Sequence, residues 1–346
     1  MNELIVINVL SKWHLYCAEA LIESRGYLNK GVDCVVFALF HEPSGSFRVT
    51  QNDLSIINNL TNVYFFQIKR ADEQNEKINT VLSSNYPYNR MLMISPRELN
   101  LRQVMATRKI SNREYVIVDE GLGSYYTKRL WDLEGKALGR KVSFKTKVKN
   151  VAKHGCEQIM RCNATKWNIL RKKGDEWIVN YDVTEALSRY FMMQEKSNIV
   201  DAEGVKDGID IYISDNLSIM SKSNEYELDF YSKVYNYIRE RNNDVGKNIY
   251  FKPHPNELRR NELIDELKHI GFQILNTRTS TEDLCNRYSM TVYGLCSTSL
   301  VTAGLLFGQN VMTLIGLLDR SCLNEYGSLR TSEFLDITQN ITEIKR

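Results

Sequence analysis

The sequence predicts an α/β protein built from two Rossmann-like domains. Short apolar, β-favouring runs alternate with segments whose apolar residues recur at helical spacing, and this alternation starts again after residue 205. With 346 residues, of which 43% are hydrophobic and 25% charged, the chain is long enough for two separate cores. We therefore place an N-terminal domain over residues 1–195 and a C-terminal domain over residues 205–346, with a polar boundary between them.

The composition narrows the class of protein. Seven scattered cysteines form no Cys-x-x-Cys pair, a usage typical of reduced thiols in a cytosolic protein. The first apolar run, residues 4–9, has no basic segment ahead of it, and nothing later approaches the roughly 18 apolar residues of a membrane-spanning helix. A net charge of +3 says little about partners. We expect a cytoplasmic protein that is neither exported nor integral to a membrane.

The first domain begins with a strand over residues 4–9, a polar turn over 11–14 and a helix over 15–23, where Leu15, Ala18 and Leu21 repeat at helical spacing. Strands and helices then continue to alternate, which favours a parallel, doubly wound sheet. The further elements expected in this domain are strands over 32–40, 63–68 and 114–118 and helices over 78–83 and 99–108.

The strand over 114–118 ends at Asp119-Glu120-Gly121, so two carboxylates stand where an apolar strand emerges. Gly121 and Gly123 allow a tight turn, through which the backbone can approach a ligand, into a helix expected from Ser124 onward. The alternative is that Asp119 or Glu120 merely caps this helix, because acidic residues are favoured near helix N-termini.

The tract from Lys128 to Lys173 is basic, and we expect much of it to be helical. We prefer to interpret it as a solvated face, but it would also suit an anionic membrane leaflet or an anionic acceptor. Few aromatic residues interleave with it and it holds no known recognition motif, so nucleic acid is not an expected partner. Residues 177–181 are either a last strand or an irregular connector.

The second domain repeats the alternation and carries no Gly-x-Gly-x-x-Gly, so a dinucleotide such as NAD is not supported. Its first strand ends at Ser214-Asp215-Asn216. A tail of short helices is expected to close the chain. The expected elements are strands over 209–213, 249–251, 272–275, 290–293 and 311–314, and helices over 230–241, 257–270 and 300–307, with a short one near Asp283.

The strand over 249–251 stops at Lys252-Pro253-His254-Pro255. Pro253 forbids a further ladder hydrogen bond, so His254 sits at the carboxyl end of a strand, which is where open α/β sheets bind ligands. The restricted φ of both prolines fixes the direction of the imidazole. The alternative is a rigid turn with a surface histidine.

Ser297, Thr298 and Ser299 follow the strand over 290–293 and open a helix. Hydroxyls and free backbone N–H groups at a helix start suit a phosphate, and Lys252 with His254 would add positive charge to the same anion. No Asp-x-Asp occurs, so handling of a nucleotide diphosphate by a metal is not indicated. A donor with one phosphate, activated without a metal or other cofactor, fits better.

The Asp-Glu-Gly, the Lys-Pro-His-Pro and the Ser-Thr-Ser, in this order and on these elements, resemble the three motifs of bacterial sialyltransferases of the glycosyltransferase-B type. That fold has two Rossmann-like domains facing each other across a cleft. The resemblance is strongest to family 52, the lipooligosaccharide and capsule enzymes, and next to the polysialyltransferases of family 38. The opening residues 9–15 are also similar to the start of family 52 chains.

The resemblance implies transfer of sialic acid from CMP-sialic acid to a sugar hydroxyl with inversion at the anomeric carbon. Asp119 would be the general base, and His254 would hydrogen-bond or protonate the departing CMP phosphate. Glu120 is expected at the substrate site but set back from the sialate, because a second free carboxylate beside the sialate carboxyl would repel it. Further residues expected at the substrates are Gly121, Ser214, Asp215, Asn216, Lys252, Pro255, Asn256, Glu257, Ser297, Thr298 and Ser299.

The expected acceptor is a terminal galactose of a surface glycan, such as lipooligosaccharide, O-antigen or a capsule repeat, with a lipid-linked form as one option. Trp13 is placed to stack on the galactose face, while His14 suits a packed structural role better. With a lipid-linked acceptor, the basic tract would contact the inner face of the cytoplasmic membrane. The alternatives are a polysialyltransferase, a CMP-Kdo transferase, a hydrolysing nucleotide-sugar epimerase with a uridine diphosphate donor, and a non-catalytic scaffold for glycan assembly.

Overall fold

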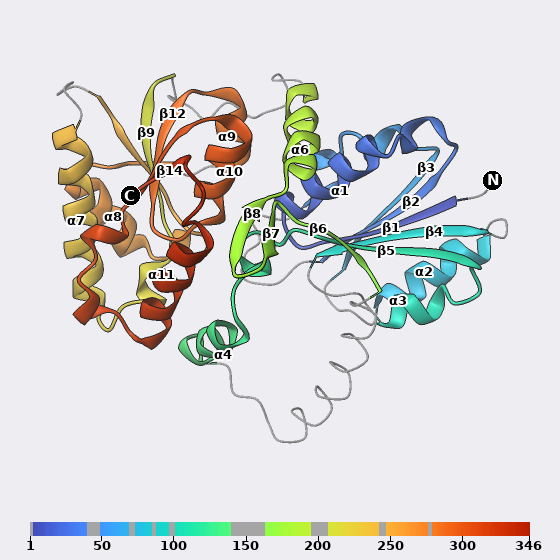
Figure 1. Cartoon of the computed structure of the whole chain (residues 1–346), viewed down its shortest axis with the longest axis horizontal. Helices are drawn as coiled ribbons and strands as arrows, with labels where there is room; N and C mark the ends of the chain where they lie inside the picture. Colours follow the sequence, from blue (N-terminus) through green and yellow to red (C-terminus); the bar gives the residue numbers. More distant parts are fainter. Residues whose placement is uncertain are drawn as a thin grey trace. The chain divides into compact units, whose positions relative to one another are not determined.

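Two compact units make up the chain in the computed structural model (Figure 1). The residues that the structure describes are 3–39, 49–68, 73–84, 88–96, 101–139, 163–194, 207–241, 247–275 and 279–346. The first unit comprises Met1–Ser124, Val142–Ile169 and Asn180–Gln194, and the second comprises Tyr125–Lys141, Leu170–Val179 and Glu195–Arg346.

The first unit is built on a six-stranded sheet in the order β3-β2-β1-β4-β5-β6, with every pair parallel. Every residue of β1 is buried, so this strand forms the centre of the core. Figure 1 shows α1 and α2 on opposite faces of the sheet. The elements are β1 (Glu3–Val9), α1 (Lys12–Ser24), β2 (Asp33–Leu39), β3 (Asn62–Ile68), α2 (Glu73–Ser84), β4 (Arg90–Pro96), α3 (Leu101–Ala106), β5 (Asn112–Val118), β6 (Thr165–Trp167) and α6 (Tyr181–Met193).

The second unit repeats this design with a parallel sheet in the order β11-β10-β9-β12-β13-β14. The rings of Tyr212, Tyr231 and Phe251 contact one another in its core. The elements are α4 (Lys128–Ala137), β7 (Leu170–Lys173), β8 (Glu176–Val179), β9 (Ile209–Ile213), α7 (Asn224–Arg241), β10 (Ile249–Lys252), α8 (Asn261–Ile270), β11 (Gln273–Ile274), α9 (Thr281–Arg287), β12 (Met290–Gly294), α10 (Thr298–Phe307), β13 (Asn310–Thr313), α11 (Glu325–Ile337) and β14 (Ile344–Lys345).

Both sheets have the strand order of a Rossmann fold, which confirms the predicted α/β class with two doubly wound parallel sheets. In each sheet the order reverses once, between β1 and β4 in the first unit and between β9 and β12 in the second. Ligands of such sheets bind outside the carboxyl ends of the strands at this reversal.

The division into units differs from the predicted one in two segments. Residues 125–141 and 170–179, which the sequence places in the N-terminal domain, group with the second unit. Residues 125–141 contact α11, because Thr127 donates to Glu333 and Tyr326 donates to Glu134 at 3.4 Å. In the segment 170–179, the Trp177 carbonyl oxygen accepts the side-chain amide of Asn340 at 3.4 Å. The predicted polar boundary, residues 195–205, lies outside the described residues.

The helix expected from Ser124 begins later. Leu122–Ser124 is one 3-10 turn, and α4 starts at Lys128 after its N-cap Thr127, whose hydroxyl accepts the Leu130 N–H. The basic tract is only partly helical as well. Helix α4 ends at Ala137, residues 140–162 lie outside the described residues, and β6 and β7 follow.

The tail of short helices is corrected to a 13-residue helix, α11, and a strand, β14, that completes the second sheet. Its N-cap Asn324 accepts the Gly327 N–H at 2.9 Å. In the part of the chain that the structure describes, no helix has the length and apolar character needed to cross a membrane.

Candidate active site

Three of the predicted polar clusters lie at the carboxyl ends of strands in the second sheet. Asp215, His254 and Ser297 follow β9, β10 and β12, and β9 lies between the other two strands in the sheet. The sequence prediction that these clusters stand at strand ends is therefore confirmed. Two of them flank the reversal of strand order between β9 and β12.

His254 is oriented by its own turn. The Asn256 N–H donates to the imidazole Nδ1 at 3.2 Å, so the neutral ring carries its proton on Nε2. Burial, followed by the positive charge of Arg330, lowers the pKa of His254 to about 4. At neutral pH the ring is thus an uncharged donor through Nε2–H.

The buried carboxyl group of Glu257 holds this turn in place. It accepts the His254 backbone N–H at 2.8 Å through one oxygen, and the hydroxyls of Ser214 (2.8 Å) and Tyr231 (3.0 Å) through the other. Burial raises the pKa of Glu257 to about 7. Ser214 and Glu257, both expected at the substrates, therefore make their contacts inside the protein.

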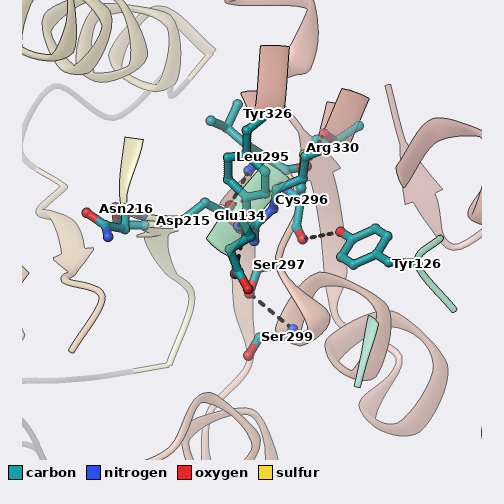
Figure 2. Close-up of polar contacts among 12 residues, drawn as sticks. Tyr126, Glu134, Asp215, Asn216, Leu295, Cys296, Ser297, Ser299, Tyr326 and Arg330 are labelled. Carbon is teal, nitrogen blue, oxygen red and sulfur yellow. Dashed lines mark hydrogen bonds and ion pairs between the residues drawn. The ribbon is translucent and has the colours of Figure 1, made fainter. Parts of the chain in front are cut away.

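The hydroxyl cluster opens helix α10 as predicted (Figure 2). Ser297 is the N-cap, and its hydroxyl oxygen accepts the Ser299 N–H at 3.2 Å. The Ser299 hydroxyl donates to the buried Glu282 at 3.3 Å. Ser297 and Thr298 are thus the pair at the helix start, whereas Ser299 is directed toward α9.

Asp215 is a central contact of this edge (Figure 2), and it is almost fully buried. One oxygen accepts the N–H groups of Leu295 (3.1 Å) and Cys296 (3.0 Å), and the other is ion-paired with Arg330 at 2.9 Å. The contacts that the structure shows for Asp215 fix the turn between β12 and α10, and its expected place at the substrates stays a prediction.

The remaining predicted residues of this edge differ in exposure. Lys252 is buried, and its carbonyl oxygen accepts the Ser214 N–H at 3.0 Å, which ties the ends of β10 and β9 together. Pro255 is half-buried and Asn256 is exposed. Asn216 has a φ of 56°, the left-handed region that non-glycine residues seldom adopt.

In the first unit, Asp119 follows β5 and is almost fully buried. Its carboxylate accepts the N–H of Gly121 and, at 2.9 Å, that of Ile169, the second residue after β6. Glu120 is half-buried, and its N–H donates to the Ser124 hydroxyl at 2.8 Å. Gly121 has a φ of 84°, so the acidic motif needs glycine at this position.

Trp13 and His14 lie in the first turn of α1, after β1 in the same sheet. Both are buried. The His14 Nδ1 accepts the Leu10 N–H at 3.1 Å, and burial lowers the pKa of His14 to about 3. His14 therefore holds the turn, as the sequence favours, while the Trp13 Nε1 has no hydrogen-bond partner among the described residues.

Arg330 on α11 is the residue that sequence reasoning missed. It comes from the segment expected to be a tail, and no motif surrounds it. Its guanidinium pairs with Asp215 and accounts for part of the lowered pKa of His254. Within the described ranges, no group of three or more His, Cys, Asp or Glu side chains is arranged to hold a metal ion.

The comparisons with known proteins agree with this architecture. At 11% identity the chain is similar to the crystal structure of a sialyltransferase from Photobacterium damsela, with a TM-score of 0.50, covering 99% of this chain and 81% of that one. It is also similar to the UDP-GlcNAc 2-epimerase from Methanocaldococcus jannaschii, at 14% identity and a TM-score of 0.50, covering 99% and 94%. These likenesses confirm the glycosyltransferase-B fold class.

The sequence comparisons identify the family. A search of curated proteins finds no match. The family model described as alpha-2,8-polysialyltransferase (POLYST) matches residues 3–315, which is most of the chain. The predicted resemblance to bacterial sialyltransferases related to the polysialyltransferases is thereby confirmed. The chain is a glycosyltransferase of sialyltransferase type and belongs to the alpha-2,8-polysialyltransferase family.

Proposed function

We propose that this protein transfers sialic acid from CMP-sialic acid to a hydroxyl of a glycan, with inversion at the anomeric carbon and without a metal. The observation that carries the proposal is the pairing of a neutral His254, protonated on Nε2, with the helix start at Ser297 on the same sheet edge. A single phosphate suits these groups, because they offer hydrogen-bond donors and an N-terminal helix dipole.

On the donor side, the Nε2–H of His254 would donate to a phosphate oxygen of CMP, and the hydroxyls of Ser297 and Thr298 would hold the same group. As the bond between the anomeric carbon and the phosphate oxygen breaks, its electron pair passes to that oxygen. The growing negative charge raises the pKa of the nearby imidazole. His254 would then change from a hydrogen-bond donor to a proton donor as the leaving group departs.

On the acceptor side, Asp119 would take the proton from the attacking hydroxyl. Backbone N–H groups of Gly121 and Ile169 hold its carboxylate in one orientation. Each carboxylate oxygen has two lone pairs, so an oxygen that accepts a backbone N–H is chemically able to accept a sugar hydroxyl as well. Attack on the face opposite the departing CMP gives inversion.

Family membership favours an acceptor that already ends in sialic acid, since the family is named for α2,8 transfer. A terminal galactose, which the sequence predicts as the acceptor, becomes the second acceptor class. The proposed setting is the cytoplasm, where a lipid-linked glycan of capsule, O-antigen or lipooligosaccharide is extended. Contact of the basic tract 128–173 with the membrane face belongs to the same proposal.

The test measures CMP release from CMP-sialic acid in EDTA, with oligosialic acid, a panel of galactosides, or no acceptor. Asp119→Ala and His254→Ala should abolish acceptor-dependent release. The matched controls are Asp182→Ala and His269→Ala, which change exposed residues of α6 and α8 and should leave the rate unchanged. Release with oligosialic acid supports α2,8 transfer, and release with a galactoside alone supports the second class.

Two results would overturn the proposal. Loss of activity in EDTA that added Mg²⁺ restores would contradict metal independence. Failure of CMP-sialic acid to bind or react with any acceptor would contradict the donor, and CMP-Kdo would be tested next. Full activity of both alanine variants would refute the catalytic roles of Asp119 and His254.

A further inference from the structure

Helix α11 is fixed to the segment that follows Asp215 and Asn216. The side-chain amide of Asn324 donates to the carbonyl oxygens of Ile219 (2.8 Å) and Ser221 (3.2 Å), and its backbone N–H donates to Met220 (2.9 Å). A Cβ at Gly327 would overlap the Met220 carbonyl oxygen, so the helix approaches this segment as closely as glycine allows. The residues of the next turn of α11 therefore have a fixed position.

Arg330 lies on that next turn, and its guanidinium is held at two points (Figure 2). Its Nη2 is ion-paired with Asp215 Oδ1 at 2.9 Å, and its Nη1 donates to the Tyr326 hydroxyl at 2.8 Å. The side chains of Arg330 and Asp215 are 17% and 2% exposed, so water screens this pair little. The Arg330 Nε is buried with no hydrogen-bond partner among the described residues.

Asp215 links the Arg330 guanidinium to the turn that leads to the start of α10. The second oxygen of Asp215 accepts the N–H groups of Leu295 and Cys296, and Ser297 follows directly as the N-cap of α10. The Tyr126 hydroxyl donates to the Cys296 carbonyl at 3.4 Å, so the N–H and the C=O of Cys296 are both held. An uncompensated carboxylate at Asp215 would be costly to bury, and Arg330 compensates it.

The same guanidinium acts on His254. The ionisable group Glu257 accepts the His254 backbone N–H, and the positive charge of Arg330 on α11 acts on the imidazole. A positive charge nearby disfavours the imidazolium, so Arg330 adds to the effect of burial. One residue of the missed helix thus acts on two of the three clusters at this edge.

We propose that Arg330 is a positioning residue that fixes the β12–α10 turn through Asp215, so that the start of α10 at Ser297 is preset for one phosphate. This inference rests on the proposed CMP-sugar donor, but its first consequence concerns the ligand-free protein. The edge would be organised before the donor binds, and the cost of ordering it would not be drawn from the binding free energy.

The test compares Arg330→Gln with Lys247→Gln. The control breaks a similar ion pair, in which Lys247 lies 2.5 Å from the buried Asp210. Asp210 is near the start of β9, so this pair lies at the opposite edge of the same sheet. Nuclear magnetic resonance titration of ¹⁵N-labelled histidines, with His254 assigned through His254→Gln, gives the pKa in the ligand-free protein. In Arg330→Gln we expect it to rise from about 4 toward 6.5, and in Lys247→Gln to stay unchanged.

Calorimetry with CMP then measures the functional consequence. Arg330→Gln should weaken binding by about tenfold or more, because the turn before Ser297 loses its charge-assisted anchor, while Lys247→Gln stays within about twofold. Arg330→Lys keeps the positive charge but lacks the planar guanidinium that bonds two partners at once. It should therefore keep the low pKa of His254 but bind CMP more weakly than wild type, and it serves if the Gln variant does not fold.

The outcomes separate the inference from the proposed function. An unchanged His254 pKa together with unchanged CMP affinity in folded Arg330→Gln would overturn the inference. Absence of CMP binding to the wild type would overturn the proposed donor, while the titration would still decide whether Arg330 sets the state of His254.

Discussion

Glu257 gives a prediction about the stability of the second unit that its buried contacts allow us to quantify. Its pKa is 4.5 in an unfolded chain and about 7 in the folded protein, where burial favours the protonated form. Between these values the native state holds a proton that the unfolded state has lost. The stability that this proton provides is complete below pH 4.5 and is lost as the pH rises through 7. At about 1.36 kcal/mol per pKa unit, the loss is about 3 kcal/mol.

Glu257→Gln removes the titration but keeps the shape of the side chain. The Gln carbonyl oxygen accepts the His254 N–H, and its amide donates to the hydroxyl oxygens of Ser214 and Tyr231, which can rotate to accept. We expect the free energy of unfolding of the variant to lack the fall of about 3 kcal/mol that wild type shows from pH 4.5 to 8. Denaturant unfolding at closely spaced pH values measures it.

The matched control is Glu266→Gln, which changes an exposed residue of α8 and should keep the wild-type pH dependence. If wild type and Glu257→Gln lose stability in parallel between pH 4.5 and 8, then Glu257 does not carry its proton into the neutral range. The assignment of a buried, protonated carboxyl under the His254 turn would then be wrong.

Three further predictions concern α11, the start of α10 and the turn after β9 in the second unit. Gly327→Ala should lower the free energy of unfolding by about 1–3 kcal/mol, because its Cβ would overlap the Met220 carbonyl oxygen; an unchanged melting curve would contradict this packing. Ser297→Ala should weaken CMP binding and cost about 1 kcal/mol of stability as a lost N-cap, whereas Ser299→Ala should leave CMP affinity within about twofold; calorimetry decides, and equal losses would refute the division. Asn216→Ala should destabilise by about 1 kcal/mol through its positive φ while Asn216→Gly does not, and equal melting temperatures would oppose this.

The sheets could be predicted from the sequence because their central strands are nearly continuous apolar runs. The strand over 209–213 was predicted with its observed bounds, for example. Helix α11 could not be found in this way. Gly327 and Thr331 are among its buried residues, so the apolar repeat that marks an amphipathic helix is weak. Close backbone approach, and not apolar burial alone, determines its position.

Only part of the site could be predicted from the sequence, and the reason is related. Sequence shows which polar residues follow strands, so Asp215, His254 and Ser297 were placed correctly at one edge. It does not show where each side chain points. The Ser214 hydroxyl turns to Glu257, and that of Ser299 turns to Glu282, because the partners come from other elements. Tertiary structure decides whether a hydroxyl lies beside a buried acid, and the sequence pattern does not reveal it.

Asp119 and Asp215 illustrate the consequence for assigning a catalytic base. Each accepts a backbone N–H from the chain leaving a neighbouring strand, Ile169 for Asp119 and Leu295 for Asp215. Loss of either carboxylate would therefore loosen a turn, and loss of activity alone does not identify the base. Asp215 is also ion-paired with Arg330, which engages the oxygen that a sugar hydroxyl would need. The pH dependence of kcat separates the two roles, since replacing a base by Asn removes the acidic limb of the profile, whereas replacing a turn-holding carboxylate lowers the rate at every pH and leaves that limb in place. We expect Asp119→Asn to behave in the first way and Asp215→Asn in the second, and the reverse result would transfer the role of base to the second unit.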